Sequence, residues 1–233
     1  YVKLKDFYRP GHGDYTYEVK FGRPVPSGGG RASGRETVGR VLAGTVARKF
    51  LSYSLKRLGT PPIEIKTCLK EIAGEKLSFA VRAEKDIPQD LLEKLKRIKD
   101  EGDSVGCVLQ CVIANAPCGL GEPVFGKLEA MLSQAVMSIG AIKAIEFGSG
   151  FEAAVLPASV QNNITKNHNG GIFAGISSGE DITFSVAIKA PPSIRKSQVV
   201  RYKDGSVKDA SIEGRHDFCL FPRIAPVIEA MCY

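Results

Sequence analysis

The chain has 233 residues, of which 43% are hydrophobic and 24% are charged. That balance is typical of a globular protein with a sizeable core, and it excludes the disordered and collagen-like classes. The length permits one large domain or two small ones. No apolar run approaches the roughly 18 residues that a membrane-spanning helix needs, so we expect a soluble protein with no membrane partner.

The two ends of the sequence and its cysteines give further expectations. The chain starts without a methionine or an apolar signal region, and an apolar helix beginning at Pro226 stops at Tyr233. We therefore expect a single domain over residues 1–233, incomplete at its N-terminus and at its C-terminus. The six cysteines form no CxxC pair, and Cys107 and Cys111 lie in an apolar run, where thiols behave as small buried hydrophobes. This usage predicts reduced thiols and a cytoplasmic protein.

The first half of the chain predicts a loop-rich segment, a long helix and a hairpin. Glycine and proline runs keep residues 1–31 free of long regular elements. Residues 63–65 and 77–81 alternate as strands with a turn around Gly74, which predicts a hairpin. A helix should run from Ser33 to Gly59, with one apolar face made by Val38, Val41, Leu42, Thr45, Val46, Phe50 and Leu51.

The second half predicts further helices between short strands. Helices are expected at 88–102 and 124–139, strands at 105–114, 141–147 and 181–189, and a polar loop at 161–171. This order lacks the regular strand–helix alternation of a doubly wound sheet. The sequence also has no GxGxxG or GxxxxGK[ST] phosphate motif. The pattern therefore predicts the α+β class.

The first block with chemical potential is Arg9-Pro10-Gly11-His12-Gly13-Asp14, which holds a histidine in a glycine-lined turn. The unperturbed pKa of histidine is about 6.5, and an adjacent anionic ligand would raise it, which would make His12 a proton donor at neutral pH. The alternative is a surface turn in which Asp14 caps a helix.

The second block is a glycine run, 28–30, that leads through Arg31 and Arg35 into the predicted helix. A helix N-terminus presents unpaired amides and a positive dipole end, and arginines add charge-assisted bonds, so the block predicts a phosphate or carboxylate site. The alternative is structural. Ser33 would cap the helix, Glu36 would complete a capping box, and the arginines would be solvated. For Arg40, Arg48 and Lys49 we favour a solvated helix face.

The third block, Gly214-Arg215-His216-Asp217-Phe218-Cys219, places a cation, a base and a carboxylate side by side. None of the three histidines shares a metal-ligand spacing with another histidine or cysteine, so we expect no metal.

These blocks resemble those of the chorismate synthase family, in order and over essentially the whole chain. The matching stretches are RPGHGDYTYEVKFG, GGGRASGRETVGRVLAGTVA, GLGEPVFGKLEAMLSQAVMSIGAIKAIEFGSGF, NHNGGIFAGISSG and GRHDFCLFPRIAPVIEAM. The resemblance implies an α+β sandwich of antiparallel sheets packed around long helices, and a homotetramer. It also implies a lyase that converts 5-enolpyruvylshikimate 3-phosphate to chorismate and phosphate by anti 1,4-elimination, with reduced FMN as cofactor and NADPH as a possible reductant.

The resemblance also implies roles for single residues. His12 would protonate the reduced flavin, and Asp217 would help to deprotonate it. Substrate anions would be bound by Arg9, Ser33, Arg35 and Arg215. The flavin would be bound by Arg31, Ala32, Ser33, Gly140, Ala141, Ala174, Lys189, Ala190, Pro191, Pro192, Ser193 and Arg215. Such an arginine-dense site also suits the net charge of +7, since the substrate carries a phosphate and two carboxylates.

The chain departs from the family pattern in several places. Residues 190–192 read Ala-Pro-Pro where the family has hydroxyl-bearing residues, Ala174 replaces a glycine, Ala32 a serine and Phe218 a proline. The family's N-terminal GESHG motif, whose histidine protonates the leaving phosphate, does not occur in this sequence. Two alternatives therefore stay beside the lyase: a catalytically incomplete remnant of the enzyme, and a basic nucleic-acid-binding module. The module lacks an obvious platform of interleaved aromatic residues, so we expect no nucleic-acid partner.

Overall fold

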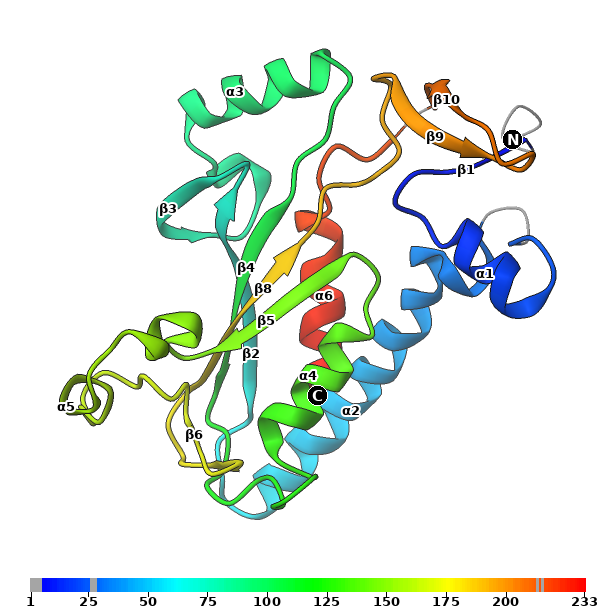
Figure 1. Cartoon of the computed structure of the whole chain (residues 1–233). Helices are drawn as coiled ribbons and strands as arrows, with labels where there is room; N and C mark the ends of the chain where they lie inside the picture. The colour runs from blue at the N-terminus through cyan, green and yellow to red at the C-terminus, as the bar shows by residue number, and fades with distance from the viewer. Residues whose placement is uncertain (1–5, 26–28, 213, 215) are drawn as a thin grey trace.

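The computed structural model describes residues 6–25, 29–212, 214 and 216–233 (Figure 1). At its centre is an antiparallel sheet of five strands in the order β3-β2-β4-β8-β5. In β4 every second residue is buried, which is the pattern of a strand with one face on the core. The strands are β2 (Glu64–Ile72), β3 (Glu75–Val81), β4 (Cys107–Ala114), β5 (Ile142–Phe147) and β8 (Ile182–Ile188).

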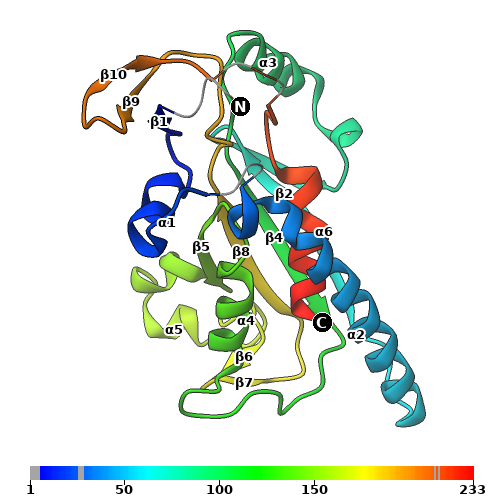
Figure 2. The ribbon, with the colours of Figure 1, turned by 90° about the vertical axis from the view of Figure 1, so that its right-hand side faces the viewer.

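Three helices cover one face of this sheet: α2 (Thr37–Arg57), α4 (Leu128–Met137) and α6 (Phe221–Cys232) (Figure 1, Figure 2). Helix α6 packs on β2 and β4 and contacts both other helices. The core lies between these layers. Its most buried side chains include Leu69 and Leu109 from the sheet and Phe221 and Ile228 from α6. Burial of such large apolar side chains is the main source of folding free energy.

A second antiparallel sheet joins the start of the chain to residues that follow β8. Its order is β1-β9-β10, with β1 (Phe7–Tyr8), β9 (Gln198–Tyr202) and β10 (Val207–Ala210). Helix α1 (Asp14–Phe21) follows β1. The remaining elements are η2 (Gly30–Ala32), η3 (Gly34–Glu36), η4 (Glu84–Asp86), α3 (Gln89–Asp100), η5 (Gly150–Ala154), α5 (Ala158–Gln161), β6 (Ile172–Phe173) and β7 (Ile176–Ser177). Across the described residues, no helix is long and apolar enough to cross a membrane.

The α+β class and most predicted elements are confirmed. The hairpin around Gly74 is formed by β2 and β3. The predicted buried strand at 105–114 is β4, and the strands at 141–147 and 181–189 are β5 and β8. The helix expected at 88–102 is α3, which begins directly after Pro88. Cys107 and Cys111 are buried, as expected for thiols in an apolar strand.

Several boundaries were predicted wrongly. The loop-rich start contains α1, which the sequence analysis missed because its apolar residues do not follow a helical period. Helix α4 begins only at Leu128, and Val124 and Phe125 before it are exposed. Helix α6 begins at Phe221 rather than at Pro226, and the proline lies inside the helix.

The apolar face predicted for the long helix is partly wrong. Val38, Leu42, Val46 and Phe50 are all at least 65% exposed. The side of α2 that meets α6 contains Gly44, where a Cβ atom would lie 2.6 Å from backbone atoms of Ala230. The helices therefore approach through a glycine, and the row of larger apolar residues at four-residue spacing faces away from them.

Candidate active site

The turn around His12 is closed by an ion pair. The Nε and Nη2 atoms of Arg9 donate to the two carboxylate oxygens of Asp14, each at 2.7 Å. Partial burial by itself raises the pKa of Asp14, but the hydrogen bonds and charge of Arg9 outweigh it and hold that pKa below its usual value. Asp14 is the first residue of α1 and makes no side-chain cap, so its alternative role as a cap is wrong.

His12 lies between a backbone carbonyl and a hydroxyl group from a distant segment. Its Nδ1 is 2.9 Å from the Pro10 carbonyl oxygen, which can only accept, so Nδ1 carries a proton. In the neutral ring Nε2 is then the acceptor, and it lies 3.3 Å from Oγ of Ser193. Burial lowers the pKa of His12, and the charges of Arg9 and Lys189 lower it further against the raising effects of the Pro10 carbonyl and Asp14.

The segment after β8 forms the opposite wall of this turn. Lys189 donates from Nζ to the carbonyl oxygen of Gly11 at 2.6 Å. Gly11 has a positive φ of 64°, and a Cβ atom there would lie 2.7 Å from Cβ of Pro192. Any side chain at position 11 would therefore separate the two segments. The backbone N–H of Lys189 donates to the Ala141 carbonyl at 3.0 Å, which brings the predicted Gly140-Ala141 pair to the same place.

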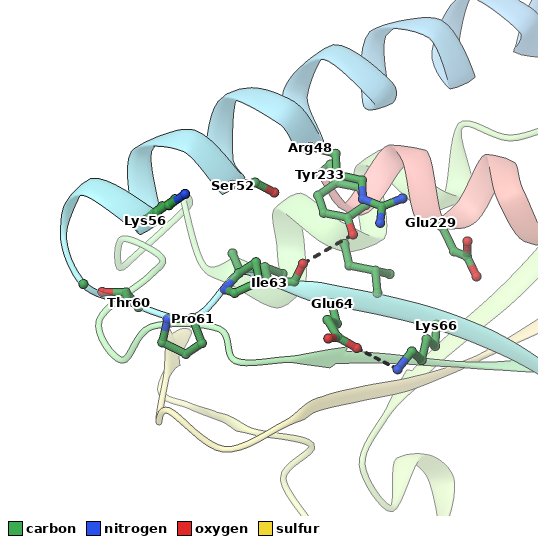
Figure 3. A pocket seen from close by; sticks show the side chains of 13 residues that line it. Arg48, Ser52, Lys56, Thr60, Pro61, Ile63, Glu64, Lys66, Glu229 and Tyr233 are labelled. Atoms are coloured by element: carbon green, nitrogen blue, oxygen red, sulfur yellow. Dashed lines mark hydrogen bonds and ion pairs between the residues drawn. The ribbon is translucent and has the colours of Figure 1, made fainter.

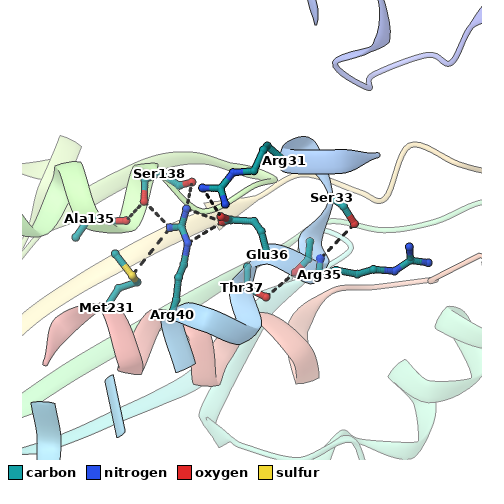
Figure 4. Close-up of polar contacts among 10 residues, drawn as sticks. Arg31, Ser33, Arg35, Glu36, Thr37, Arg40, Ala135, Ser138 and Met231 are labelled. Atoms are coloured by element: carbon teal, nitrogen blue, oxygen red, sulfur yellow. Dashed lines mark hydrogen bonds and ion pairs between the residues drawn. The ribbon is translucent and has the colours of Figure 1, made fainter. Parts of the chain in front are cut away.

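The second block is held by a network around Arg40 (Figure 4). Arg40 pairs with Glu36 at 2.7 Å and donates to Oγ and the carbonyl oxygen of Ser138, two residues before Gly140. Our expectation that Arg40 lies on a solvated face is therefore wrong. The capping box is also wrong, because the Glu36 carboxylate bonds Arg40 instead of the backbone. Ser33 caps the short helix η3 that leads into α2, since its Oγ accepts the N–H of Arg35 at 3.2 Å. The long helix α2 begins only after Glu36 and has no side-chain cap of its own, so the cap lies one short helix earlier than expected.

Arg31 and Arg35 leave their charges accessible. The side chain of Arg31 is 85% exposed and lies 3.7 Å from Glu36, a loose ion pair. Arg35 is exposed, and within the described part of the chain no carboxylate pairs with its guanidinium. Ala32 lies next to the His12 turn, because a Cβ atom at Gly13 would lie 3.9 Å from Cβ of Ala32. The first and second blocks therefore form adjoining walls.

The third block is only partly described, and Arg215, which was predicted to bind the substrate and the flavin, lies outside the described residues. Asp217 accepts from Nη1 of Arg223 at 2.7 Å. Nε2 of His216 lies 2.8 Å from the Ile212 carbonyl oxygen, and the Ile212 N–H donates to the carbonyl of Ile194 at 3.4 Å. The third block therefore adjoins the segment that ends at Ser193.

Ala174 lies apart from the turn around His12. It sits in the turn between β6 and β7, and its neighbour Gly175 accepts the N–H of Leu128, where α4 begins. Gly140 follows the other end of α4. A helix of ten residues is about 15 Å long. The structure therefore separates Ala174 from Ala141 and Lys189 within one chain.

A cavity of about 940 Å³ lies elsewhere, between the second half of α2, the start of β2 and the end of α6 (Figure 3). Its charged lining includes Arg48, Lys56 and Glu229, and no predicted site residue lines it. Arg48 was expected on a solvated face, and it lies over the ring of Tyr233 at 6.0 Å. The cavity is therefore distinct from the cluster around His12.

Sequence reasoning missed three residues that position the site: Ser138, Arg223 and Ser104. The hydroxyl of Ser104 donates to the Pro191 carbonyl at 2.6 Å. The one local signal for this network was the four-residue spacing of Glu36 and Arg40, which is the spacing of ion pairs on a helix. The contacts of Ser104 and Ser138 join segments distant in sequence, and no local pattern indicates them.

The sequence matches the chorismate synthase family over residues 1–233. A chorismate synthase from Treponema denticola is 46% identical over 251 residues, covering 100% of this chain and 70% of the relative. One from Archaeoglobus fulgidus is 45% identical over 249 residues, covering 99% and 69%. A crystal structure of a chorismate synthase matches with a TM-score of 0.69 and 23% identity over 94% of this chain and 67% of the other, a likeness of fold. On the sequence matches, the chain belongs to the chorismate synthase family.

Proposed function

We propose that this chain is a carbon–oxygen lyase that converts 5-enolpyruvylshikimate 3-phosphate to chorismate and phosphate by anti 1,4-elimination. Family membership supports the activity. The observation that carries it to this chain is the meeting of His12, Ala141 and the segment from Lys189 to Ser193, which come from three separate parts of the chain. Neither a nucleic-acid-binding module nor an inactive remnant is favoured by these findings.

The substrate's phosphate and two carboxylates need cations and hydrogen-bond donors, and the site offers both. We assign this role to Arg9, Ser33, Arg35 and Arg215. Arg35 supports the assignment best, because it is exposed beside the N-terminal turn of α2, where backbone amides also favour anions. Asp14 fixes Arg9 in the turn by two hydrogen bonds, so Arg9 would meet the substrate in a defined orientation.

The residues present also fit the phosphate and ring of FMN. Lys189 and Arg31 supply cations, Ser193 a hydroxyl group, and Arg31 to Ser33 with Gly140 and Ala141 supply backbone. Pro191 and Pro192 have neither an N–H nor a hydroxyl, so only their carbonyl oxygens and rings could contact a cofactor. When bound, reduced FMN supplies the electron-rich ring that the family requires without consuming it, and NADPH is the proposed reductant.

Two side chains would hold or move a proton. An anion bound beside His12 would raise its pKa, so Nε2 would be protonated and could donate toward the cofactor side of the turn. Asp217, held by Arg223, offers a carboxylate as the acceptor in the opposite direction. The two groups would thus carry one proton in and out during each turnover.

An anaerobic assay of the full-length polypeptide that carries this sequence tests the activity. With reduced FMN and 5-enolpyruvylshikimate 3-phosphate we expect release of one phosphate per chorismate formed. FMN fluorescence should be quenched by saturable binding that the substrate strengthens. Salt-sensitive binding of RNA or DNA without phosphate release would instead support the nucleic-acid module. A polypeptide that binds FMN and substrate but releases no phosphate would be the inactive remnant.

We further propose a cytoplasmic homotetramer. All six cysteines are free, which suits a reducing compartment. The exposed apolar row on α2 supports association, because contiguous apolar surface usually marks an interface. Sedimentation velocity should give the mass of four copies, and a monomer at micromolar concentration would contradict the assembly.

A further inference from the structure

Arg40 is a mostly buried cation that contacts residues of three helices (Figure 4). It lies in the first turn of α2, and its Nε donates to Oε1 of Glu36, the residue before that helix, at 2.8 Å. Its Nη1 donates to Oγ of Ser138, the residue after α4, and its Nη2 donates to the Ser138 carbonyl oxygen at 3.1 Å. Nη1 also lies 4.0 Å from the sulfur of Met231 in α6. Only 21% of the Arg40 side chain is exposed.

The planar guanidinium of Arg40 matches this set of partners. Its Nη2 also lies 2.7 Å from Oε1 of Glu36, so the carboxylate both neutralises the cation and fixes the direction of the fork. The carbonyl oxygens at the end of α4 carry partial negative charge, which favours a cation there. Arg40 therefore joins the end of α4 to the start of α2 by charge-assisted hydrogen bonds.

The residues that follow Ser138 include Gly140 and Ala141, one wall of the proposed flavin site. Ala141 has a φ of 75°, in the left-handed region that residues with a Cβ atom rarely adopt. Such a backbone persists only where the surrounding structure holds it. The N–H of Lys189 donates to the Ala141 carbonyl and holds the turn from the side of β8. Arg40 holds the turn from its other side, through the two hydrogen bonds to Ser138.

Glu36 brings a second wall of the site to the same network. Its other carboxylate oxygen, Oε2, lies 3.7 Å from Nη2 of Arg31, whose side chain is 85% exposed. Figure 4 shows the side chains of Arg31 and Arg40 both directed toward this carboxylate. Because Arg40 forms the close ion pair with Glu36, Arg31 has only a loose one and keeps its charge accessible to an anion.

We propose that Arg40 is a positioning residue for flavin binding, an inference that rests on the proposed function. It ties Ser138 to the start of α2 and so keeps the Gly140–Ala141 wall at a fixed separation from the wall that contains Arg31. Arg40→Ala removes both hydrogen bonds to Ser138 and leaves the turn at Ala141 held from one side. A hydrogen bond to a charged group is typically worth about tenfold or more in an equilibrium constant, so the Kd for FMN should rise by at least that factor.

The test is a titration of the full-length polypeptide with oxidised FMN, in which quenching of the flavin fluorescence gives Kd without substrate or turnover. Ser138→Ala keeps the ion pair of Arg40 with Glu36 and removes one acceptor, so it should raise Kd by about threefold or more. In a double-mutant cycle, Arg40→Ala with Ser138→Ala should bind FMN as weakly as Arg40→Ala alone, because both changes break the same contact. Lys49→Ala is the matched control, since it removes an equal charge from an exposed position of α2 and should leave Kd unchanged.

Independent effects that multiply in the double variant would overturn the positioning role of Arg40. Equal Kd values for Ser138→Ala and Lys49→Ala would also overturn it, even if Arg40→Ala did not fold. Failure of the proposed function gives different results. A wild-type protein that binds no FMN would overturn both the proposed function and this role. A wild-type protein that binds FMN and substrate but releases no phosphate would overturn the function alone, and the cycle would still measure the contribution of Arg40 to flavin binding.

Discussion

At the residue scale, the environment of His12 makes a prediction about stability and pH. Its pKa in the folded protein lies below the unfolded value of about 6.5. Between those two values the unfolded chain binds more protons, so stability falls as pH falls through that window. His12→Gln cannot titrate. Urea unfolding at pH 7.5 and pH 5.5 should therefore show a smaller acid loss in His12→Gln than in the wild type, and equal losses would contradict the buried, neutral ring.

His12 and Asp217 also carry the catalytic prediction. Groups that transfer protons contribute about a hundredfold or more to rate, so His12→Ala and Asp217→Ala should each slow turnover by at least that factor. Single-turnover kinetics with saturating substrate would measure it. Ser193→Ala removes the hydroxyl group near Nε2 but not the imidazole, and it serves as a milder comparison. An unchanged rate in either alanine variant would remove the role assigned to that residue.

Arg223 should act as a positioning residue for Asp217. Their ion pair is exposed, with side-chain exposures of 69% and 39%, so it contributes little to stability. Arg223→Ala should slow turnover while the urea midpoint changes little, because the carboxylate loses its fixed orientation. Arg223→Lys keeps the charge and should recover part of the rate. If alanine and lysine variants were equally slow, or if both were unfolded, the positioning role would be rejected.

Whether a residue's contacts could be predicted from the sequence depended on how far apart the two partners lie along the chain. His12, Asp14 and the glycines of their turn are neighbours in sequence, and their types indicated a constrained, charged turn. Arg9, the partner of Asp14, is only five residues away, but this ion pair was not predicted, because an aspartate next to a helix start more commonly caps the helix.

At the element scale, the contact between α2 and α6 depends on one glycine. A Cβ atom at Gly44 would lie 2.6 Å from Cα, Cβ and the carbonyl oxygen of Ala230. Replacing an internal helix glycine with alanine normally stabilises by about 1 kcal/mol, but overpacking costs about 1–3 kcal/mol. Gly44→Ala should therefore lower the free energy of unfolding, as measured by urea denaturation.

Gly39 supplies the matched control for this prediction. It lies in the same helix, and a Cβ atom there would meet nothing within 4 Å. Gly39→Ala should raise the free energy of unfolding by up to about 1 kcal/mol through helix propensity alone. If both variants raised the free energy of unfolding, α2 and α6 could move apart at Gly44 without loss of stability, and the prediction for Gly44 would be wrong.

Elements with a clear apolar period were predictable, and those fixed by tertiary contacts were not. The alternation of apolar residues predicted β4, and their helical spacing predicted α3. Strands β9 and β10 have mainly exposed or half-buried residues and depend on pairing with each other and with β1. In α2 the period identified the helix but not its buried side. The row of larger apolar residues and the side that contains Gly44 were both candidates for that contact, and the close approach of the two backbones at Gly44 decides it.

At the scale of the whole molecule, the candidate site is assembled from segments that the sheet and its helices bring together. The family resemblance predicted which residues belong to the site, but not the distances between them. Lys189 and Ala141 meet because β5 and β8 are paired neighbours, and the His12 turn reaches them through Lys189 and Ser193. Ala174 was assigned to the same set, and the length of α4 holds it away.

This assembly predicts that FMN stabilises the chain as a whole, because one ligand would bridge segments that separate on unfolding. At a concentration about 100-fold above Kd, FMN should add about 2.7 kcal/mol to the free energy of unfolding. Arg35→Ala should weaken binding and reduce the rise in melting temperature. Lys56→Ala removes an equal charge near the far end of α2, about 30 Å from Arg35 by helix length. This variant should leave the rise in melting temperature unchanged. A specific site distinguishes two cations on one helix. If both variants reduced the rise in melting temperature equally, FMN binding would depend on net charge rather than on this site.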